Sequence, residues 1–237
     1  MTETPSPAAR QPIAFAVDCD RTLTGEDLVP DPEALFAIAA LREAGIPCVL
    51  VTGRAKEDLE RFSTIADSFD AYALEGGAVW GPWNTLLRPS NVDIVLKAAD
   101  RVAEAGIEVE RRSASFSVAI KDLQVLQEKA ADCSLQTNID RVDVLPPGLD
   151  KGTGLDGALG SLGIRAAHVV AIGDGENDIP LFDRSNVALA VANAVPALKE
   201  IADEILAEAG PKGVVDAAHR LLKGEWRTDP PVPPAAA

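Results

Sequence analysis

The sequence predicts an α/β fold in which a doubly wound parallel sheet carries a small α+β unit as an insertion. Strand and helix patterns alternate near the start of the chain and again near its end, which predicts the parallel sheet. Between these two stretches the pattern changes to hairpin and helix signals, which predicts the inserted unit. A length of 237 residues suits one domain with an insertion.

The first part of the sheet is predicted by three apolar runs that helical patterns separate. The strands are expected at residues 13–17, 46–51 and 71–74. Asp31 as an N-cap before Pro32 predicts a helix that ends at Gly45, and a second helix is expected at residues 56–66. Parallel strands joined by such helices form right-handed crossovers.

The pattern of the inserted unit begins after Gly77. We expect a hairpin over residues 78–87, helices over 92–105 and 123–131, and strands over 107–111, 116–120 and 141–145. From Lys151 the first pattern resumes, with strands at 169–172 and 187–191 and helices at 151–162, 179–183, 195–202 and 214–222. The core is therefore expected at residues 12–77 and 147–224, the inserted unit at 78–146, and disordered ends at 1–11 and 225–237.

Composition excludes several classes of partner. The chain is 47% hydrophobic and 25% charged, so it can build a full core, but its formal net charge is −15. Nucleic acids and anionic membranes need basic surfaces, so we expect neither as a partner. The three cysteines are widely spaced and form no CxxC pair, which excludes a disulfide framework or a zinc site and indicates a cytoplasmic protein.

Two carboxylates follow the first predicted strand directly, in the sequence Asp18-Cys19-Asp20-Arg21-Thr22-Leu23-Thr24. Ligands of open α/β sheets bind outside the carboxyl ends of the strands. Burial of acidic groups there is costly unless a cation compensates, so a metal ion or a basic side chain is expected nearby. Taken alone, the same residues fit a strand that runs into an acidic turn.

Other polar side chains occur at corresponding places farther along the chain. Thr52 ends the second strand, Lys151 starts the helix after the insertion, and Asp174 and Asp178 flank a later strand-to-helix turn. Each alone has a simpler interpretation, as a helix cap, a solvated lysine or a turn residue. Their joint order predicts one site, because the strand ends of a doubly wound sheet converge on one edge.

This set of side chains suits phosphoryl transfer. The carboxylates of Asp18 and Asp174 could hold Mg²⁺, which prefers oxygen ligands. Thr52 and the backbone N–H groups at helix starts could bind phosphoryl oxygens. Lys151 supplies the positive charge that the acidic chain otherwise lacks there.

Two loop motifs compete with this interpretation. An EF-hand loop starting at Asp18 would need Gly at position 23 and Glu at position 29, where Leu23 and Val29 stand. Residues 152–157 match the dinucleotide fingerprint G-x-G-x-x-G, with Asp174 about 20 residues on. Against a dinucleotide-binding oxidoreductase, six residues separate these glycines from the preceding strand.

The sequence resembles the haloacid dehalogenase-like (HAD) hydrolase superfamily. Residues 18–24 resemble its DxDxT first motif and residues 51–54 its second, Lys151 resembles the third, and Gly173-Asp174-Gly175-Glu176-Asn177-Asp178 resembles the fourth. The insertion matches the position of a C2 cap. These features, with Glu75-Gly76-Gly77-Ala78, are similar to subfamily IIB, which includes Cof-type, sucrose-phosphatase-like and archaeal phosphoglycolate phosphatases, and imply a Rossmann-like core.

The resemblance implies a Mg²⁺-dependent phosphatase of a small phosphorylated metabolite, of the phosphoglycolate or sugar phosphate class. Asp18 would be the nucleophile and would form an aspartyl-phosphate, and Asp20 would be the general acid and base. The implied metal residues are Asp18, Asp20, Asp174 and Asp178. The implied substrate contacts are Thr52, Gly53, Arg54, Lys151 and Asn177. A phosphomutase of the same superfamily and a non-catalytic, receiver-like module remain alternatives.

One position departs from the family, which usually has Gly where Arg21 stands. Arg21 could narrow the pocket, pair with Asp20 or reach the substrate. The cap is expected to set specificity, with Trp80, Trp83, Arg88, Arg111, Arg112 and Phe116 as candidate contacts. Because neighbouring residues of a strand point to opposite faces, at most one of Arg111 and Arg112 can face the site.

Overall fold

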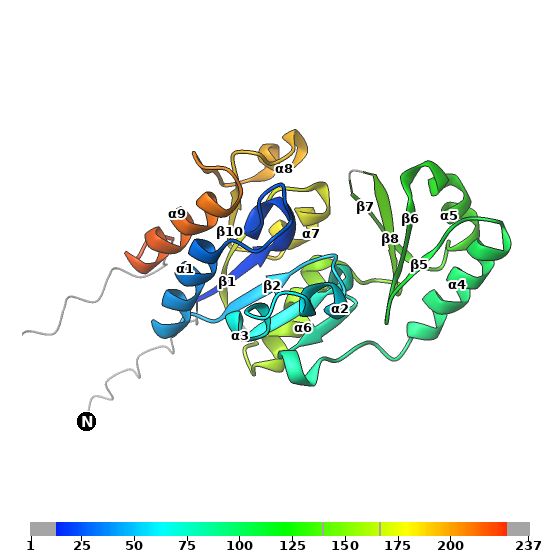
Figure 1. Cartoon of the computed structure of the whole chain (residues 1–237), viewed down its shortest axis with the longest axis horizontal. Coiled ribbons are helices and arrows are strands. Elements are labelled where there is room, and N and C mark those ends of the chain that lie inside the picture. The colour runs from blue at the N-terminus through cyan, green and yellow to red at the C-terminus, as the bar shows by residue number, and fades with distance from the viewer. Residues whose placement is uncertain (1–12, 139, 166, 227–237) are drawn as a thin grey trace, which may run out of the picture.

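The computed structural model describes residues 13–138, 140–165 and 167–226, and contains two sheets (Figure 1). The larger sheet has seven strands in the order β11-β10-β9-β1-β2-β3-β4, and the smaller has four in the order β5-β6-β8-β7. In the larger sheet every pairing is parallel except that of β3 with β4. The predicted α/β class with an inserted α+β unit is therefore confirmed.

The larger sheet is built from both ends of the described chain. Its strands are β1 (Ile13–Asp18), β2 (Cys48–Val51), β3 (Ala71–Leu74), β4 (Val79–Gly81), β9 (His168–Gly173), β10 (Val187–Ala190) and β11 (Glu204–Ile205). Its helices are α1 (Pro32–Glu43), α2 (Lys56–Glu60), α3 (Ile65–Ser68), α6 (Lys151–Ser161), α7 (Ile179–Asp183), α8 (Pro196–Ile201) and α9 (Gly210–Leu222). β1 lies in the middle, between β2 and β9, and is buried almost throughout. A central position places its carboxyl end at the centre of the site edge.

The smaller sheet and two helices form the inserted unit, which we call the cap. It contains α4 (Val92–Glu104), β5 (Glu110–Arg111), β6 (Phe116–Ala119), α5 (Leu123–Lys129), β7 (Ser134–Asn138) and β8 (Arg141–Leu145). Apolar side chains of β6 and β8 form a separate core with α4 and α5. Because successive strand residues alternate, the opposite face of the sheet is polar and carries Ser115, Ser117, Gln136 and Asp143, which are buried.

The structure differs from the predicted elements in three places. β4 pairs with β3 in the larger sheet, although the sequence pattern assigns residue 78 onward to the insertion, so we place the start of the cap after β4. The expected helix over residues 56–66 is broken into α2 and α3, and the Tyr72 hydroxyl contacts the carbonyls of Ile65 (2.6 Å) and Ala66 (2.9 Å) in α3. β7 and β11 were not predicted, because one is mostly polar and the other has two residues.

Other expectations hold at the level of single residues. The Asp31 carboxylate accepts hydrogen bonds from the N–H groups of Glu33 (2.9 Å) and Ala34 (3.0 Å), as expected of the N-cap of α1. No helix among the described residues is long and apolar enough to cross a membrane. The predicted leader, residues 1–11, and most of the predicted tail lie outside the described residues.

Close backbone packing fixes α6 against the larger sheet. A Cβ on Gly154 would lie 2.4 Å from the Cα of Gly77, and a Cβ on Gly77 would lie 2.0 Å from the carbonyl oxygen of Asp150. Gly77 also has a positive φ of 101°. The helix that begins with Lys151 is therefore held at this depth by contacts that no side chain larger than hydrogen allows.

Substitution of Gly154 tests this packing. We expect Gly154→Ala to lower the free energy of unfolding by about 1–3 kcal/mol, because the added methyl forces α6 away from the turn after β3. Gly160→Ala is the matched control in the same helix, since a Cβ there meets nothing within 4 Å. It should raise stability by about 0.5–1 kcal/mol through helix propensity. Urea denaturation of both variants measures the difference, and equal effects would contradict the packing argument.

Candidate active site

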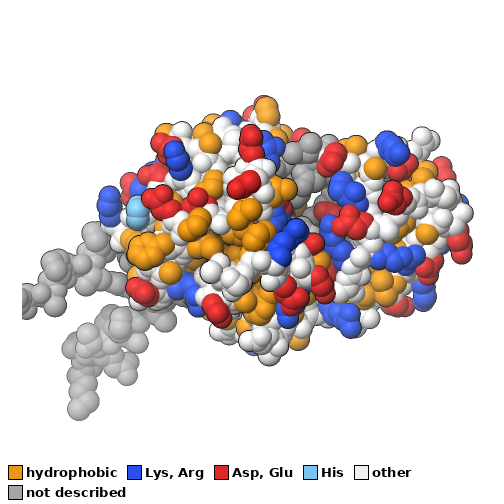
Figure 2. Space-filling model, viewed as in Figure 1, with side chains coloured by type: hydrophobic (Ala, Val, Ile, Leu, Met, Phe, Trp, Pro, Cys, Tyr) orange, Lys and Arg blue, Asp and Glu red, His pale blue; other side chains and the backbone are white. Residues whose placement is uncertain are grey.

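A cavity of about 1010 Å³ lies between the carboxyl ends of the core strands and the polar face of the cap sheet. Figure 2 shows basic and acidic side chains gathered where the core and the cap meet. The predicted site residues that line the cavity are Asp18, Asp20, Gly53, Arg54, Lys151, Asp174 and Asn177. The predicted convergence of separate strand ends is thus present in the structure.

The centre of the site is a buried ion cluster around Lys151. Its Nζ donates to Oδ1 of Asp18 (2.7 Å) and to Oδ1 of Asp178 (2.5 Å). Lys151 and Asp178 are fully buried, and Asp18 is nearly so. The interpretation of Lys151 as a solvated lysine is therefore wrong, because α6 carries it to the end of β1.

The turn after β9 places the remaining acidic groups. Oδ2 of Asp178 accepts the backbone N–H groups of Asp174 and Gly175, both at 3.0 Å. Since Lys151 uses the other oxygen of Asp178, that carboxylate fixes the turn and does not line the cavity. Asp174 does line it and accepts a long hydrogen bond from the Thr22 hydroxyl (3.4 Å).

Burial sets the protonation of these groups. It raises the pKa of Asp18 well above its usual range, the charge of Asp178 adds to this effect, and Lys151 opposes it. Burial, again with Asp178, raises the pKa of Asp174 to about 6. Burial alone would lower the pKa of Lys151, but the carboxylates of Asp178 and Asp18 raise it above its usual range, so the ammonium keeps its proton.

Asp20 points to a different partner. Its carboxylate accepts from Nε (3.0 Å) and Nη2 (2.5 Å) of Arg54, which also donates to the carbonyl oxygen of Leu28 (2.9 Å). Asp20 is 37% exposed at the side chain, whereas Arg54 is 11% exposed and lies 5.7 Å over the ring of Phe62. The two aspartates of the first motif therefore have separate surroundings, one beside a lysine and one beside an arginine.

Thr52 lies beneath the cavity rather than in its wall. The residue is fully buried, and its hydroxyl oxygen accepts the backbone N–H of Arg54 (3.1 Å). This contact stabilises the loop of residues 52–54 that carries Gly53 and Arg54 into the cavity wall. The loop is held from below as well, because the N–H groups of Glu75 and Gly76 donate to the carbonyls of Arg54 and Thr52, both at 2.9 Å.

Arg21 contacts the acidic cluster rather than Asp20. Its Nε lies 3.9 Å from Oδ2 of Asp174, and its side chain is 39% exposed and lines the cavity. The alternative in which it pairs with Asp20 is not what the structure has, since Arg54 takes that place. Arg21 has a positive φ of 61°, a conformation that glycine adopts more readily than a residue with a side chain.

Only one of the candidate cap contacts lines the cavity, and it is Arg112. Its Nη1 donates to the carbonyl oxygen of Gly53 (2.8 Å) and to Asp143 (3.1 Å). Arg111 points the other way and pairs with Asp100 of α4 (2.8 Å), as the alternation of strand residues requires.

The other candidate cap contacts lie outside the cavity wall and make packing or surface contacts. Trp80 lies in β4, where a Cβ on Gly157 would come within 2.8 Å of its ring, and Trp83 packs edge to face on Tyr72. Phe116 belongs to the core of the cap, and Arg88 makes only a long contact with the Ser113 carbonyl (3.4 Å). Trp80 and Trp83 fall in the hairpin predicted for the insertion, but β4 belongs to the larger sheet.

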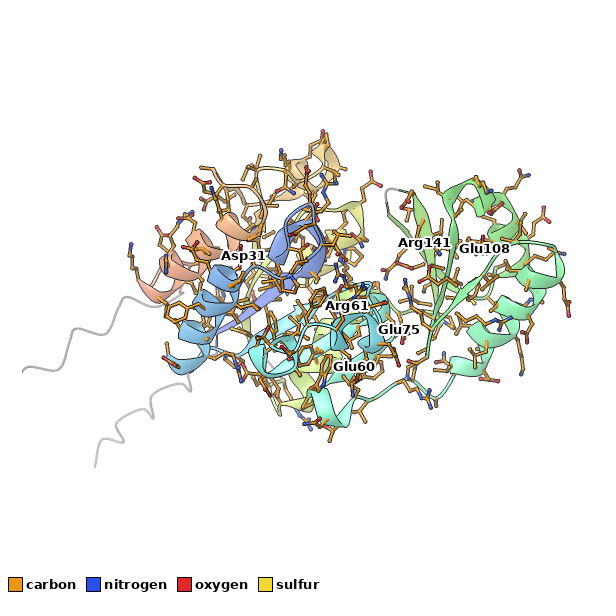
Figure 3. All side chains as sticks on the ribbon, viewed as in Figure 1. Asp31, Glu60, Arg61, Glu75, Glu108 and Arg141 are labelled. Carbon is orange, nitrogen blue, oxygen red and sulfur yellow. The ribbon has the colours of Figure 1, made fainter. Side chains whose placement is uncertain are left out.

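Sequence reasoning missed two buried carboxylates, that of Asp143, which lines the cavity and pairs with Arg112, and that of Glu75. Glu75 lies between the core and the cap (Figure 3) and is 2% exposed. Its side chain accepts hydrogen bonds from cap residues Ser113, Ala114 and Ser115. The signal available for Glu75 was an acidic residue directly after an apolar strand, the same signal that identified Asp18.

The G-x-G-x-x-G match has a packing explanation. All three glycines lie inside α6, where a Cβ on Gly152 would meet the carbonyl oxygen of Pro180 at 2.3 Å. A Cβ on Gly154 would likewise clash with Gly77, and a Cβ on Gly157 would clash with the ring of Trp80. No loop between a strand and a helix is left at these residues to bind a pyrophosphate, so the dinucleotide interpretation is wrong.

The donor set fits a divalent cation. Asp18, Asp174 and Asp178 each place a carboxylate oxygen within 4.8 Å of the others'. Burial raises the pKa values of Asp18 and Asp174, and repulsion from Asp178 adds to the rise, so a bound cation would favour the ionised carboxylates. Hard cations such as Mg²⁺ prefer these oxygen ligands.

The metal-free stability of an Asp174→Asn variant tests this electrostatic description. The carboxyl has a pKa of about 6 when folded and 3.8 as a free side chain, so the folded state holds its proton more tightly. The contribution of Asp174 to stability therefore falls as pH rises from about 4 to about 6. In the presence of a chelator at about pH 7.5, the variant should be more stable than wild type by about 1–3 kcal/mol.

The difference in stability between the variant and wild type should narrow as pH falls from about 6 toward 4, because Asp174 of wild type becomes protonated there. Urea denaturation at several pH values measures it. A variant that is less stable than wild type at neutral pH without metal would contradict the description.

Comparisons with known proteins agree with this geometry. The model of the haloacid dehalogenase-like hydrolase family matches residues 93–217. Over 89% of its length the chain is 32% identical to a phosphoglycolate phosphatase of Archaeoglobus fulgidus, covering 97% of it. The chain is also 35% identical to phosphoglycolate phosphatase 2 of Saccharolobus solfataricus, in a match that covers 90% of this chain and 94% of that protein.

A solved structure of a HAD subclass IIB sugar phosphatase has the same fold. It superposes with a TM-score of 0.74 at 17% identity, over 88% of this chain and 98% of that one. The predicted class of enzyme, a phosphatase of a small phosphorylated substrate, is confirmed by these relatives. The chain belongs to the haloacid dehalogenase-like hydrolase family.

Proposed function

We propose that the protein hydrolyses a phosphomonoester of a small metabolite, phosphoglycolate or a sugar phosphate, through an aspartyl-phosphate on Asp18 and with Mg²⁺. The observation that carries this proposal is the Asp18 carboxylate, which stands at the end of β1, faces the cavity and lies 2.7 Å from the Lys151 ammonium. The names of the archaeal relatives favour phosphoglycolate. We also propose a cytoplasmic location, since Cys19, Cys48 and Cys133 are free among the described residues.

In the first step an Asp18 oxygen attacks phosphorus and the ester P–O bond breaks. Protonated Asp20 gives its proton to the departing alkoxide. Lys151 pairs with the phosphoryl oxygens, and the N–H groups of the 52–54 loop and Asn177 orient them. Asp18, Asp174 and the Asp20 carbonyl would hold Mg²⁺, which would supply positive charge to neutralise the phosphoryl oxygens and the carboxylates.

In the second step Asp20 removes a proton from water, which attacks phosphorus and breaks the bond to the Asp18 oxygen. Phosphate is released, and both aspartates return to their starting states. The step needs Asp20 to be free to exchange protons, yet Arg54 holds its carboxylate in this structure. Arg54 therefore moves from Asp20 to the phosphoryl group when the substrate binds, a change that the exposed side chain of Asp20 allows.

Replacement of the nucleophile tests the proposal. Asp18→Asn should lower kcat for p-nitrophenyl phosphate with Mg²⁺ by at least about a thousandfold, because the amide cannot form the phosphoryl intermediate. Asp70→Asn is a control at the opposite end of the sheet, where Asp70 accepts the N–H of Cys48 (2.9 Å) and pairs with Arg42. It should keep a rate close to that of wild type.

Phosphate release from a panel of phosphoglycolate and sugar phosphates identifies the substrate in the same assay. Hydrolysis by Asp18→Asn at the wild-type rate would exclude Asp18 as the nucleophile and overturn the proposed mechanism.

A further inference from the structure

Glu75 is a buried acidic group that lies outside the ion cluster around Lys151 and contacts the cap instead. It follows β3 in a turn where Glu75, Gly76 and Gly77 all have positive φ, of 50°, 68° and 101°. The left-handed conformation is unfavourable for a residue with a side chain, so something must compensate for it. Figure 3 shows Glu75 on the side of the core that faces the cap, and its carboxylate accepts hydrogen bonds from cap residues.

The carboxylate is fully used by the cap. Oε1 of Glu75 accepts hydrogen bonds from the N–H (3.2 Å) and the hydroxyl (2.5 Å) of Ser113. Oε2 accepts hydrogen bonds from the N–H of Ala114 (2.9 Å) and the hydroxyl of Ser115 (2.8 Å). Hydrogen bonds to a charged acceptor are the strong ones in proteins. Four of them on one buried carboxylate hold the chain segment before β6 directly against the core.

Two further contacts join the same segments. Arg112, the residue before Ser113, donates to the Gly53 carbonyl (2.8 Å), and Gln136 of β7 donates to the Gly76 carbonyl (3.1 Å). The main chain of the Glu75 turn in turn holds the 52–54 loop through the carbonyls of Thr52 and Arg54. Hydrogen bonds thus connect the cap to the Glu75 turn, and the turn to the 52–54 loop.

We propose that Glu75 is a positioning residue that locks the cap onto the 52–54 loop, so that the substrate cavity is formed before the substrate arrives. Covalently the cap is joined to the core by only two chain segments, at residues 82–91 and 146–150. Without the lock, these connections leave the cap free to change its orientation. With it, Arg112 stays on the cavity wall in a fixed place relative to Lys151.

Hydrogen exchange tests the lock directly and without substrate. Glu75→Gln keeps the length of the side chain but offers one acceptor oxygen, so about half of the donors lose their partner. Exchange in the segment 112–118 should become at least about tenfold faster, and exchange in β9 should not change. Asp70→Asn is the matched control, because it also removes a carboxylate that accepts a backbone N–H, and it should leave the segment 112–118 as in wild type.

Ser115→Ala supplies a milder variant in case Glu75→Gln does not fold. It removes one of the four hydrogen bonds and leaves the carboxylate in place, so exchange in the same segment should rise in the same direction but less. Exchange in 112–118 that stays within about twofold of wild type in both variants would overturn the lock.

Kinetics separate positioning from a general loss of structure; this second measurement rests on the proposed function. For p-nitrophenyl phosphate, Glu75→Gln should raise KM by roughly tenfold with a much smaller change in kcat, because the cavity is disordered while Asp18 is untouched. An equal loss in Glu75→Gln and Asp70→Asn would assign Glu75 a merely structural role. If wild type shows no hydrolysis at all, the proposed function fails, while the exchange result still decides the lock.

Discussion

The interaction on which the site depends is the buried contact of Lys151 with Asp18 and Asp178. One ammonium stands between two carboxylates that the core has removed from water. Loss of the lysine would leave two uncompensated buried charges, which is far more costly than loss of an exposed ion pair. The same contact aligns Asp18 and favours its ionised form, since the Lys151 ammonium opposes the rise in pKa that burial causes.

The rest of the fold can be understood as the means of bringing these groups together. β1 and β9 are neighbours, so their carboxyl ends place Asp18 beside the turn of Asp174. The glycines of α6 allow the helix to lie close enough for Lys151 to reach both carboxylates. The acidic groups at this edge lie close enough together to favour a divalent cation as a ligand. The charges that hold these elements together are therefore the same charges that the proposed chemistry uses.

The sequence predicted the parallel sheet and most of the site, because strand ends and helix starts have strong local signals. Asp18, Lys151 and Asp174 were identified by their places after apolar runs and before a helix. Side-chain pairing was harder to predict, since it depends on tertiary distance. Arg54 was expected at the substrate but holds Asp20, and Glu75 holds the cap, a partner that its place after an apolar strand does not reveal.

The central claim is that Asp18 carries the phosphoryl group during turnover. The most direct measurement is acid quenching of the enzyme during hydrolysis of p-nitrophenyl phosphate with Mg²⁺, followed by borohydride reduction and peptide mass mapping. An aspartyl-phosphate is reduced to homoserine, so the account predicts homoserine at position 18 in wild type and not in Asp18→Asn. Unmodified Asp18 in an enzyme that is turning over, or homoserine at position 20 or 174 instead, would contradict it.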